Sequence, residues 1–199
     1  MNGSMAILIA YLLGGIPFGY ILVRLTTGKD VRSSGSGNIG ATNVLRTTGR
    51  AIAVITLLLD IAKGVGAVWI AEYLTSGDIT WMSGAALAVM AGHAYPVFLK
   101  FKGGKAVASF IGAFAYLTPL PMLAVLLVFV IVVAATKHIS AGSIVAAAMF
   151  PFGVWMILHP PAAEVIAAAI AGAFIVVRHS ANIHRLRAGT ESVFTWKKR

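Results

Sequence analysis

Three polar segments of this chain combine glycines with side chains that can bind an anion: residues 33–46 (SSGSGNIGATNVLR), 92–105 (GHAYPVFLKFKGGK) and 178–191 (RHSANIHRLRAGTE). Glycine permits positive φ angles and a close approach of the backbone to a ligand, and successive amides in such turns can surround an anion. Arginine and lysine add cations suited to phosphate oxygens. Only two acidic residues, Asp30 and Glu191, lie in or beside these segments. Together they predict a site for an anion with more than one phosphate-sized group.

Each segment on its own also has a simpler interpretation. The first can be a flexible loop, the second a basic patch on anionic lipid, where each charge contributes about 1 kcal/mol, and the third a helix end at the membrane surface. The adjacent Gly103 and Gly104 favour a specific site, because a basic patch needs no special backbone. If the last helix continues into the third segment, His179, Asn182 and Arg185 share one polar face.

Two short motifs in these segments do not carry their usual function. Residues 35–40 spell G-x-G-x-x-G, but a dinucleotide site needs a strand before that loop, and a long apolar stretch precedes it here. The pair Gly104 and Lys105 does not end a nucleotide-binding phosphate loop, because that motif needs a glycine at the position of Leu99. No cluster of Cys, His and acidic residues has metal-ligand spacing, so we expect neither a metal nor a cofactor.

The elements that must position these segments are apolar and long. Of the 199 residues, 59% are hydrophobic and 11% are charged, and the mean hydropathy is +0.89, whereas an ordinary soluble domain is about 45–50% apolar and about 25% charged. A membrane helix needs about 20 apolar residues. We therefore expect a single all-α integral membrane domain over residues 1–199, with seven transmembrane helices. The expected spans cover about residues 4–25, 51–74, 81–98, 106–118, 120–136, 139–158 and 162–178.

The count of seven depends on the uncharged stretch 106–136, in which Pro119 and Pro121 allow either one kinked helix or two short ones. With two helices, fifteen of the sixteen Lys and Arg residues fall on one side of the membrane, including Lys137 and the basic residues at 197–199. Cytoplasmic loops carry an excess of Lys and Arg, so the N-terminus is expected outside and the C-terminus, with all three polar segments, in the cytoplasm. The net charge of +10 then reflects topology, and nucleic acid is not an expected partner.

Polar residues inside the spans have mainly structural interpretations. Asp60 and Lys63 lie three residues apart in the second span, and because intramembrane charges are costly, a buried pair that holds helices in register is favoured over a proton relay. His93, near a helix end, is also interpreted as structural. His159 and Glu164 spell H-x4-E, similar to the H-x4-D motif of soluble-type acyltransferases, but two adjacent prolines and an outer-face position indicate a chance match.

The three segments together resemble the signatures of the PlsY-type acyl-phosphate:glycerol-3-phosphate acyltransferases of bacterial inner membranes. The resemblance covers the whole chain and rests on GSGNIGATNVLR, GHAYPVFLKFKGGKAVA and H-x-x-N-I-x-R-L-x-x-G-T-E in that order, with Asp60-x-x-Lys63-Gly64 as a further similarity. It implies transfer of a fatty acyl group from acyl phosphate to glycerol 3-phosphate, forming lysophosphatidate and phosphate in the first step of phospholipid synthesis. It also implies neither acyl-CoA nor acyl carrier protein as direct donor, no metal, and an active site at the cytoplasmic face. Membrane lipid is an expected partner, and we infer no obligatory protein partner.

The residues suit this chemistry, because acyl phosphate is already activated and the enzyme must chiefly orient two anions and neutralise the departing phosphate. The residues expected to be catalytic are Ser36, Arg46, Lys105 and His179. Those expected to bind substrate or phosphate are Gly35, Gly37, Asn38, Gly40, Thr42, Asn43, Gly103, Gly104, Asn182, Arg185, Gly189, Thr190 and Glu191. In this scheme the first loop cradles one phosphate, Arg46 and Lys105 hold glycerol phosphate or balance the leaving group, and the third segment positions the acceptor.

The base that removes the acceptor proton has three candidates: His179, Glu191 and the substrate's own phosphate. We favour the substrate phosphate, because no His–carboxylate dyad stands out and a cation-rich site opposes protonation of a histidine.

Two other classes of function are alternatives. A transporter of organic phosphates typically has its polar groups near the bilayer midplane and between internal repeats, whereas here they gather on one face and no repeat is seen. A structural or lipid-binding membrane protein explains the basic edge but not the glycine loops.

Overall fold

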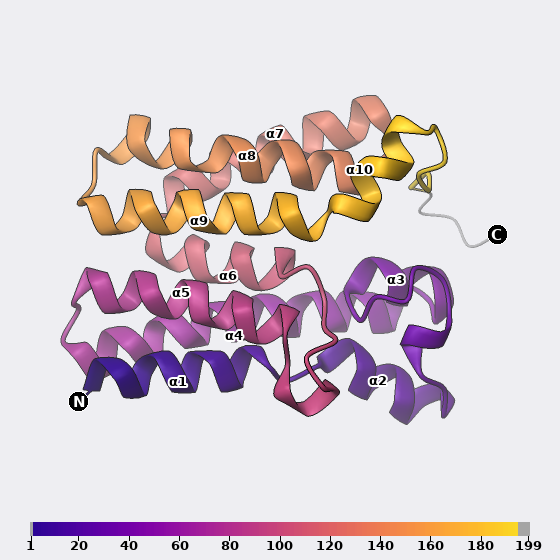
Figure 1. Cartoon of the computed structure of the whole chain (residues 1–199), viewed down its shortest axis with the longest axis horizontal. Coiled ribbons are helices and arrows are strands. Elements are labelled where there is room, and N and C mark those ends of the chain that lie inside the picture. The colour runs from indigo at the N-terminus through magenta and orange to yellow at the C-terminus, as the bar shows by residue number, and fades with distance from the viewer. Residues whose placement is uncertain (1, 195–199) are drawn as a thin grey trace. The chain divides into compact units, whose positions relative to one another are not determined.

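The computed structural model describes residues 2–194, and every regular element in this range is a helix. The chain forms two compact units, one ending at Tyr116 and the other beginning at Leu117. The first contains α1 (Asn2–Gly14), α2 (Phe18–Thr27), η1 (Val31–Ser33), α3 (Ala41–Thr47), α4 (Arg50–Thr75), α5 (Ile79–Ala94), η2 (Val97–Leu99) and α6 (Val107–Leu117) (Figure 1). The second contains α7 (Pro119–Thr136), α8 (Ile139–Leu158), α9 (Ala162–Arg178) and α10 (Ser180–Arg187).

The first expected span is a broken helix. α1 and α2 together form a candidate membrane span, Asn2–Thr27, but the chain leaves helical geometry between Gly14 and Phe18. Pro17 immediately precedes α2 and has no amide hydrogen, so it cannot extend the hydrogen bonds of α1 and is well suited to the start of a helix. The break places backbone carbonyl groups inside an apolar layer, where each of them needs a hydrogen-bond donor.

Glycines bring the helices of the first unit into close contact. A methyl group at Gly14 would overlap the backbone of Val89, so α1 and α5 touch through their main chains. Likewise, a methyl group at Gly64 would overlap the α6 backbone, and one at Gly112 would overlap the carbonyl of Ile61 in α4. Small residues allow such approach between membrane helices, where packing rather than the exclusion of water favours association. Main-chain contacts therefore set the spacing of these helices.

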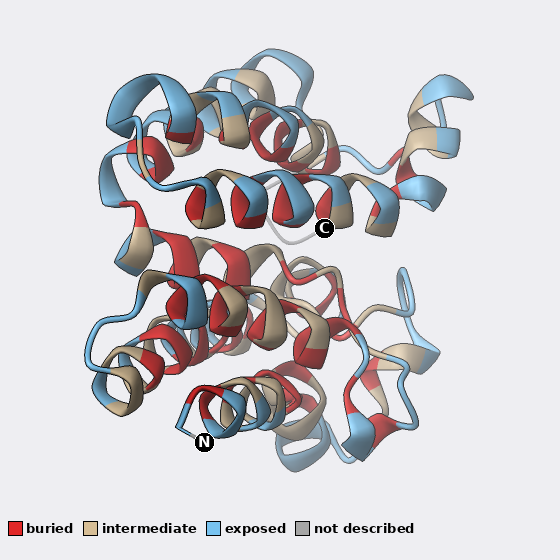
Figure 2. Cartoon of the chain, turned by 60° about the vertical axis from the view of Figure 1, so that its left-hand side comes forward, coloured by how far each residue is buried: buried red, intermediate tan, exposed pale blue. Residues whose placement is uncertain are grey.

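Large apolar side chains cover the outer faces of the helices. Within each unit, buried residues line the sides of helices that face one another, and exposed residues lie outward (Figure 2). On α7, Leu120, Leu123 and Leu127 are 60%, 63% and 62% exposed. A contiguous apolar surface of this kind is unusual for a protein in water, whereas lipid chains are as apolar as leucine. The outer faces thus fit a lipid environment.

The expected spans agree with most of the observed helices. The stretch 106–136 is two helices, as predicted, and the spans 139–158 and 162–178 coincide with α8 and α9. Among residues 2–194, five segments are long and apolar enough to cross a membrane, and a sixth counts if α9 and α10 form one span despite their 56° bend. α6 has only 11 residues. Seven spans, the orientation of the termini and a single domain stay predictions.

Candidate functional site

One buried asparagine holds the first polar segment together. Asn43 donates through Nδ2 to the carbonyls of Val31, Ser34 and Asn38, at 3.1, 3.1 and 2.8 Å. Its Oδ1 accepts from the amide of Ser36 at 2.8 Å. Each polar atom of this side chain is therefore engaged within the loop, which folds back onto α3. These contacts give Asn43 a structural role in the loop, and its expected role as a substrate ligand stays a prediction.

Two glycines give the same segment its shape. Gly35 and Gly37 have φ angles of +61° and +69°, a region that favours glycine, and a methyl group at Gly35 would overlap Oδ1 of Asn43. Asn38 Oδ1 accepts from the amide of Gly40 at 2.8 Å. The amides of Ser36 and Gly40 donate to side chains of the loop itself. The backbone therefore offers fewer hydrogen-bond donors to an anion than the sequence indicated. Side chains must carry more of any anion binding.

An ion pair closes the start of this segment. Arg32 contacts Asp30 at 2.7 Å, and its guanidinium carbon lies 5.1 Å from the centre of the Tyr20 ring. The hydrogen bond from Arg32 lowers the pKa of the Asp30 carboxyl, and Asp30 in turn raises the pKa of the guanidinium. Arg32 is thus engaged in the scaffold, whereas Arg46 is an exposed cation at the end of α3.

The second polar segment is a strained loop between α5 and α6. Lys100, Phe101 and Ala106 have φ angles of +54°, +61° and +62°. A non-glycine residue in this region costs about 1–3 kcal/mol, and such strain persists only where the surrounding structure enforces it. The strained residues flank Lys105, one of the expected catalytic residues. Strain of this kind clusters at functional sites.

The glycine pair before Lys105 packs on the end of α5. Gly103 donates its amide to the Ala94 carbonyl at 3.1 Å, and Gly104 donates to the His93 carbonyl at 3.0 Å. A methyl group at Gly103 would overlap the His93 carbonyl, and one at Gly104 would overlap the His93 imidazole. The pair was expected to allow an anion to approach closely. In the structure it allows the loop itself to approach α5.

The first two polar segments share a hydrophobic core. This cluster contains Val23, Val31, Ile39, Val44, Ala53 and Leu99, with Tyr20, Leu45 and Ile52 packed against it. Ile39 and Val44 come from the first segment and Leu99 from the second, so both segments contribute to one core in the part of the unit that contains α2 and α3 (Figure 1). The approach of Arg46 to Lys105 stays a prediction.

The third polar segment changes direction at His179. α9 ends at Arg178, as the expected span does, and α10 begins at Ser180 with a bend of 56°, so the helix does not continue straight into this segment. His179 is buried, and its Nδ1 lies 2.8 Å from the carbonyl of Ile175. Because a carbonyl only accepts, Nδ1 carries the hydrogen, and Nε2 of the neutral ring is an acceptor.

Glu191 gathers three side chains of the second unit. Its Oε1 accepts from Asn182 Nδ2 at 2.7 Å and from Ser140 Oγ at 2.9 Å, and its Oε2 accepts from Arg185 Nε at 2.7 Å. Burial raises the pKa of the Glu191 carboxyl, but the hydrogen bonds from Asn182, Arg185 and Ser140 outweigh burial, and the pKa lies below its ordinary value. A carboxylate held in this way is a weak base. It anchors α10 and Asn182 to the start of α8.

Other expected ligands of the third segment shape the turn that brings Glu191 into place. Gly189 has a φ of +66°, and the amide of Thr190 donates to the carbonyl of Arg185 at 2.9 Å. The chain then follows the start of α8, where Phe194 donates its amide to the carbonyl of Lys137 at 2.7 Å. These contacts give the segment a structural role that the sequence did not indicate.

The expected residues are distributed over both units. Ser36, Arg46 and Lys105 belong to the first unit, and His179 and Asn182 to the second. Convergence of the third segment with the other two stays a prediction. Sequence reasoning did not identify Ser140 or the proximity of His93 to Asp60. The signals available for the latter were a charge inside one span and a histidine near the end of the next.

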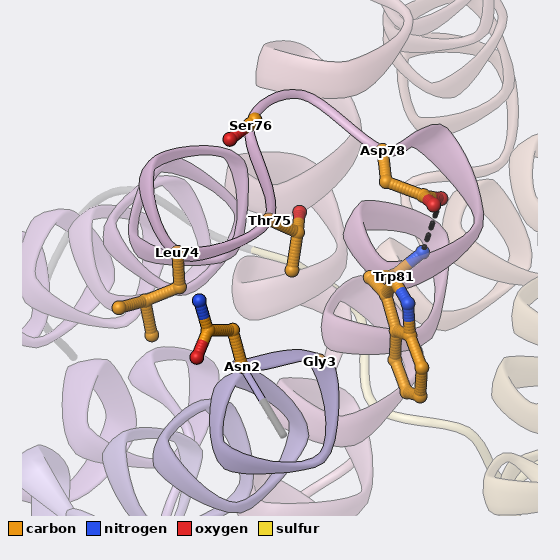
Figure 3. A pocket seen from close by; sticks show the side chains of 7 residues that line it. All are labelled: Asn2, Gly3, Leu74, Thr75, Ser76, Asp78 and Trp81. Carbon is orange, nitrogen blue, oxygen red and sulfur yellow. Dashed lines mark hydrogen bonds between the residues drawn. The ribbon is translucent and has the colours of Figure 1, made fainter.

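A pocket lies at the other end of the first unit. Its volume is about 400 Å³, and it is lined by Asn2, Gly3, Leu74, Thr75, Ser76, Asp78 and Trp81 (Figure 3). These residues come from the start of α1, the end of α4, the turn that follows it and the start of α5. Asp78 is engaged as the N-cap of α5, accepting from the amide of Thr80 at 2.8 Å. The pocket lacks cationic side chains and is not the expected anion site.

Comparisons with known proteins agree over nearly the whole chain. Residues 4–189 match the family described as glycerol-3-phosphate acyltransferase. A protein of that name from Desulforamulus reducens is 45% identical, covering 98% of this chain and 96% of its own, and one from Geobacter sulfurreducens is 44% identical, covering 98% of each.

Two solved structures are similar to the chain throughout. One is PlsY (YgiH), an integral membrane glycerol 3-phosphate acyltransferase, in its glycerol 3-phosphate form, with 36% identity, a TM-score of 0.92 and coverage of 98% of this chain and 96% of that one. The other is the lysophosphatidic acid form, with 34% identity, a TM-score of 0.89 and coverage of 98% and 97%.

Proposed function

Because the chain belongs to the family of glycerol-3-phosphate acyltransferases and is a multi-pass integral membrane protein, we propose that it acylates glycerol 3-phosphate with acyl phosphate as the donor. A hydroxyl oxygen of glycerol 3-phosphate attacks the acyl carbon, an ester bond forms, and the bond between the acyl carbon and the phosphate oxygen breaks. The products are lysophosphatidate and inorganic phosphate. Solved relatives in a glycerol 3-phosphate form and a lysophosphatidic acid form support this acceptor and this product.

One observation carries the assignment of the site in the first unit. The first two polar segments contribute to one hydrophobic core, which supports a common site for Arg46 at the end of α3 and Lys105 in the loop before α6, and backbone hydrogen bonds hold parts of both segments. Cations presented on a rigid, largely neutral scaffold suit the stabilisation of a transferring phosphate. We assign Arg46 and Lys105 to the phosphates, with Ser36 and Asn38 as neighbouring hydrogen-bonding groups.

The remaining expected residues divide by role. His179 and Asn182 position the acceptor, as the resemblance implied. Asn43, Gly103, Gly104 and Glu191 support the loops from which the binding groups project. This division follows the contacts described above, in which the polar atoms of Asn43 and of Glu191 are already bonded to their own segments.

The leaving phosphate is the proposed acceptor of the hydroxyl proton. Glu191 is disfavoured as the base, because its pKa lies below the ordinary value through the hydrogen bonds it accepts. The pH–rate profile of His179→Asn tests the proposal against His179. Loss of the acidic limb in that variant, the fall in rate at low pH that protonation of a base causes, with glycerol 3-phosphate binding retained, would assign the base to His179 instead.

The proposed topology has seven spans, with the N-terminus outside and the active site on the cytoplasmic face of the bacterial inner membrane. The chain contains no cysteine, so single cysteines at Ser34, Lys102 and Ser76 can be labelled without background. A membrane-impermeant maleimide should label Ser76→Cys in intact cells and the other two only after the inner membrane is opened. Labelling of Ser34→Cys and Lys102→Cys from opposite sides would exclude a common site.

The decisive test of the reaction is an acyl-transfer assay on the purified full-length protein. Palmitoyl phosphate, palmitoyl-CoA and palmitoyl acyl carrier protein are compared as donors to glycerol 3-phosphate, and lysophosphatidate is measured. Activity with acyl phosphate alone is expected. Uptake of glycerol 3-phosphate into proteoliposomes without acylation would identify a transporter, and neither activity would leave only a lipid-binding or structural role.

A further inference from the structure

A buried polar cluster lies beneath the two polar segments of the first unit. Asp60 in α4 contacts Lys63 Nζ through Oδ1 at 2.7 Å, and His93 Nδ1 of α5 lies 3.6 Å from the same oxygen. Ser109 Oγ of α6 lies 3.3 Å from His93 Nδ1. The side chains of Asp60, Lys63 and His93 are 3%, 1% and 4% exposed. Burial of ions at this depth costs several kcal/mol for each ion unless they are paired.

One arm of the cluster reaches the break between α1 and α2. Lys63 Nζ donates to the carbonyl of Ile16 at 3.0 Å and lies 5.7 Å from the centre of the Phe18 ring. α2 starts at this point, and a methyl group at Gly19 would overlap the carbonyl of Ile39. The lysine therefore fixes the origin of the helix on which the first polar segment packs.

The other arm reaches the second polar segment. His93 lies in the last turn of α5, and its carbonyl accepts the amide of Gly104 at 3.0 Å. Its ring fills the space that a methyl group at Gly104 would occupy. Lys105 is the next residue of the chain. The position of the His93 ring therefore sets the path of the backbone immediately before Lys105.

We propose that Asp60, Lys63 and His93 are positioning residues that hold the two phosphate-binding segments of the first unit at a fixed separation. Asp60 Oδ1 is the shared neighbour of Lys63 and of His93. A displacement of Lys63 therefore changes the surroundings of His93, and the reverse. The inference rests on the proposed function, because that function assigns Arg46 and Lys105 to phosphates. If the Asp60–Lys63 ion pair only held α4 in register, it would not need to contact Ile16 or His93, but it lies against both.

The first experiment removes both charges together, because a lone buried Lys63 or Asp60 would be strongly destabilising. In the full-length protein, Asp60→Leu/Lys63→Met is expected to fold and insert with a melting temperature near that of the parent, because an apolar pair of similar volume commonly replaces a buried ion pair without loss of stability. Its kcat/KM should fall at least tenfold. Glu164→Gln, which alters a buried carboxyl of α9, and Ser83→Ala, which alters a buried hydroxyl of α5, are matched controls expected to retain activity. Parent-like kcat/KM in the double variant overturns the proposal.

The second experiment tests whether His93 acts through Gly104. Gly104→Ala should lower kcat/KM at least tenfold in the parent, because the added methyl group meets the His93 ring. In a His93→Asn background, where the outer ring atoms are absent, the same change should cost less than threefold. Equal losses in both backgrounds would show that His93 does not set the loop, and so would overturn this arm. A merely structural role predicts independent effects.

The third experiment measures the separation without using activity. Because the chain has no cysteine, spin labels at Ser34→Cys and Lys102→Cys, both exposed in the structure, report one distance between the two segments. We expect a narrow distribution in the parent and in Ser83→Ala, and a shifted or broader one in Asp60→Leu/Lys63→Met. An unchanged distribution in that double variant contradicts the proposal. If the distribution responds but the parent transfers no acyl group, the proposed function fails and the positioning network stands.

Discussion

The polar loops of the first unit and the polar segment of the second are fixed by different physical means. In the first unit, the Asn43 amide and positive-φ glycines such as Gly35 determine the loop through neutral hydrogen bonds. In the second, one carboxylate, Glu191, holds Ser140, Asn182 and Arg185. The loop around Asn43 is held mainly by neutral groups, with an exposed ion pair at its start, whereas the segment around Glu191 is held by a buried charged group. The comparison therefore predicts that the two regions respond differently to mutation and to pH.

The largest effect is expected from Lys105→Ala, which removes a cation assigned to phosphate. Loss of one group that stabilises charge in the transition state commonly lowers the rate by about 100-fold to 1,000-fold, and we expect kcat/KM to fall by that amount. Arg46→Ala should behave in the same way. Steady-state acyl transfer, with melting temperature as the check on folding, measures both.

Lysines outside the assigned site test whether activity depends on the position of a cation or only on the total charge. Lys29→Ala removes an exposed cation from the same end of the unit but outside the assigned site and should change activity less than twofold. Lys198→Ala, which lies outside the described residues, is also expected to change little. Normal turnover of both Arg46→Ala and Lys105→Ala would remove the distinction between a binding region and a structural one.

The next largest effect is expected from Glu191→Gln, which keeps the shape of the side chain and removes its charge. Hydrogen bonds to charged groups contribute about 1.5–3 kcal/mol each, so we expect the free energy of unfolding to fall by roughly that amount. Unfolding in detergent, followed by helix content, provides the measurement. Glu164→Gln changes a buried carboxyl of α9 and should cost less; equal losses would show that Glu191 is not a clamp.

A third prediction probes the glycine geometry of the first segment. Gly35→Ala adds a methyl group that meets Asn43 Oδ1 at a φ of +61°, and kcat/KM is expected to fall about tenfold, a loss equivalent to about 1.4 kcal/mol. Gly28→Ala is the control, because Gly28 has a φ of +70° but a methyl group added there would meet no atom within 4 Å. It shares the backbone strain without the clash. Similar activity in both variants would mean that Asn43 does not transmit the loop's shape to the site.

The response to pH distinguishes the two regions further. The pKa of Glu191 in the folded protein lies below its ordinary value of 4.5, so its contribution to stability is fully present above that value and is lost as the pH falls through the folded-state pKa. The melting temperature of the parent should therefore fall more steeply below pH 4.5 than that of Glu191→Gln. Parallel curves would argue against the clamp.

The smallest effect is expected at the ion pair of the first unit. Asp30 and Arg32 are about one-third exposed, at 33% and 32%, and ion pairs in such surroundings contribute about 0.2–1 kcal/mol. Asp30→Asn should therefore change the free energy of unfolding by no more than about 1 kcal/mol and leave acyl transfer nearly unchanged. A large loss of activity would show that the first loop, too, depends on charge for its structure.

The spans could be predicted from the sequence where one local signal dominates. The bounds of α8 and α9 follow from apolar runs separated by Pro160 and Pro161. The break after α1 and the bend at His179 were not predicted, because hydropathy does not register where a helix changes direction. At the break, the deciding contact is with Lys63, about fifty positions away in the chain.

The candidate site could be predicted in composition but only partly in role. Glycines, amides and cations in three segments indicated phosphate chemistry, and the first two segments do share a core. The roles of Asn43 and Gly103 were not predictable, because a sequence does not tell whether a polar group or a close approach serves a ligand or the protein's own backbone. That distinction depends on which carbonyl groups of the fold need donors, and only the structure supplies it.

The reciprocal fit of Gly64 and Gly112 restricts how this protein can change. A side chain on either residue would displace the backbone of the opposite helix. No substitution on that helix can compensate, because the clash is with its main chain. In a saturation scan, both positions should reject every substitution, including alanine, whereas a lipid-facing position such as Leu127 should accept most apolar residues. The crossing of α4 and α6 would then be among the slowest parts of the molecule to diverge, for reasons of geometry alone.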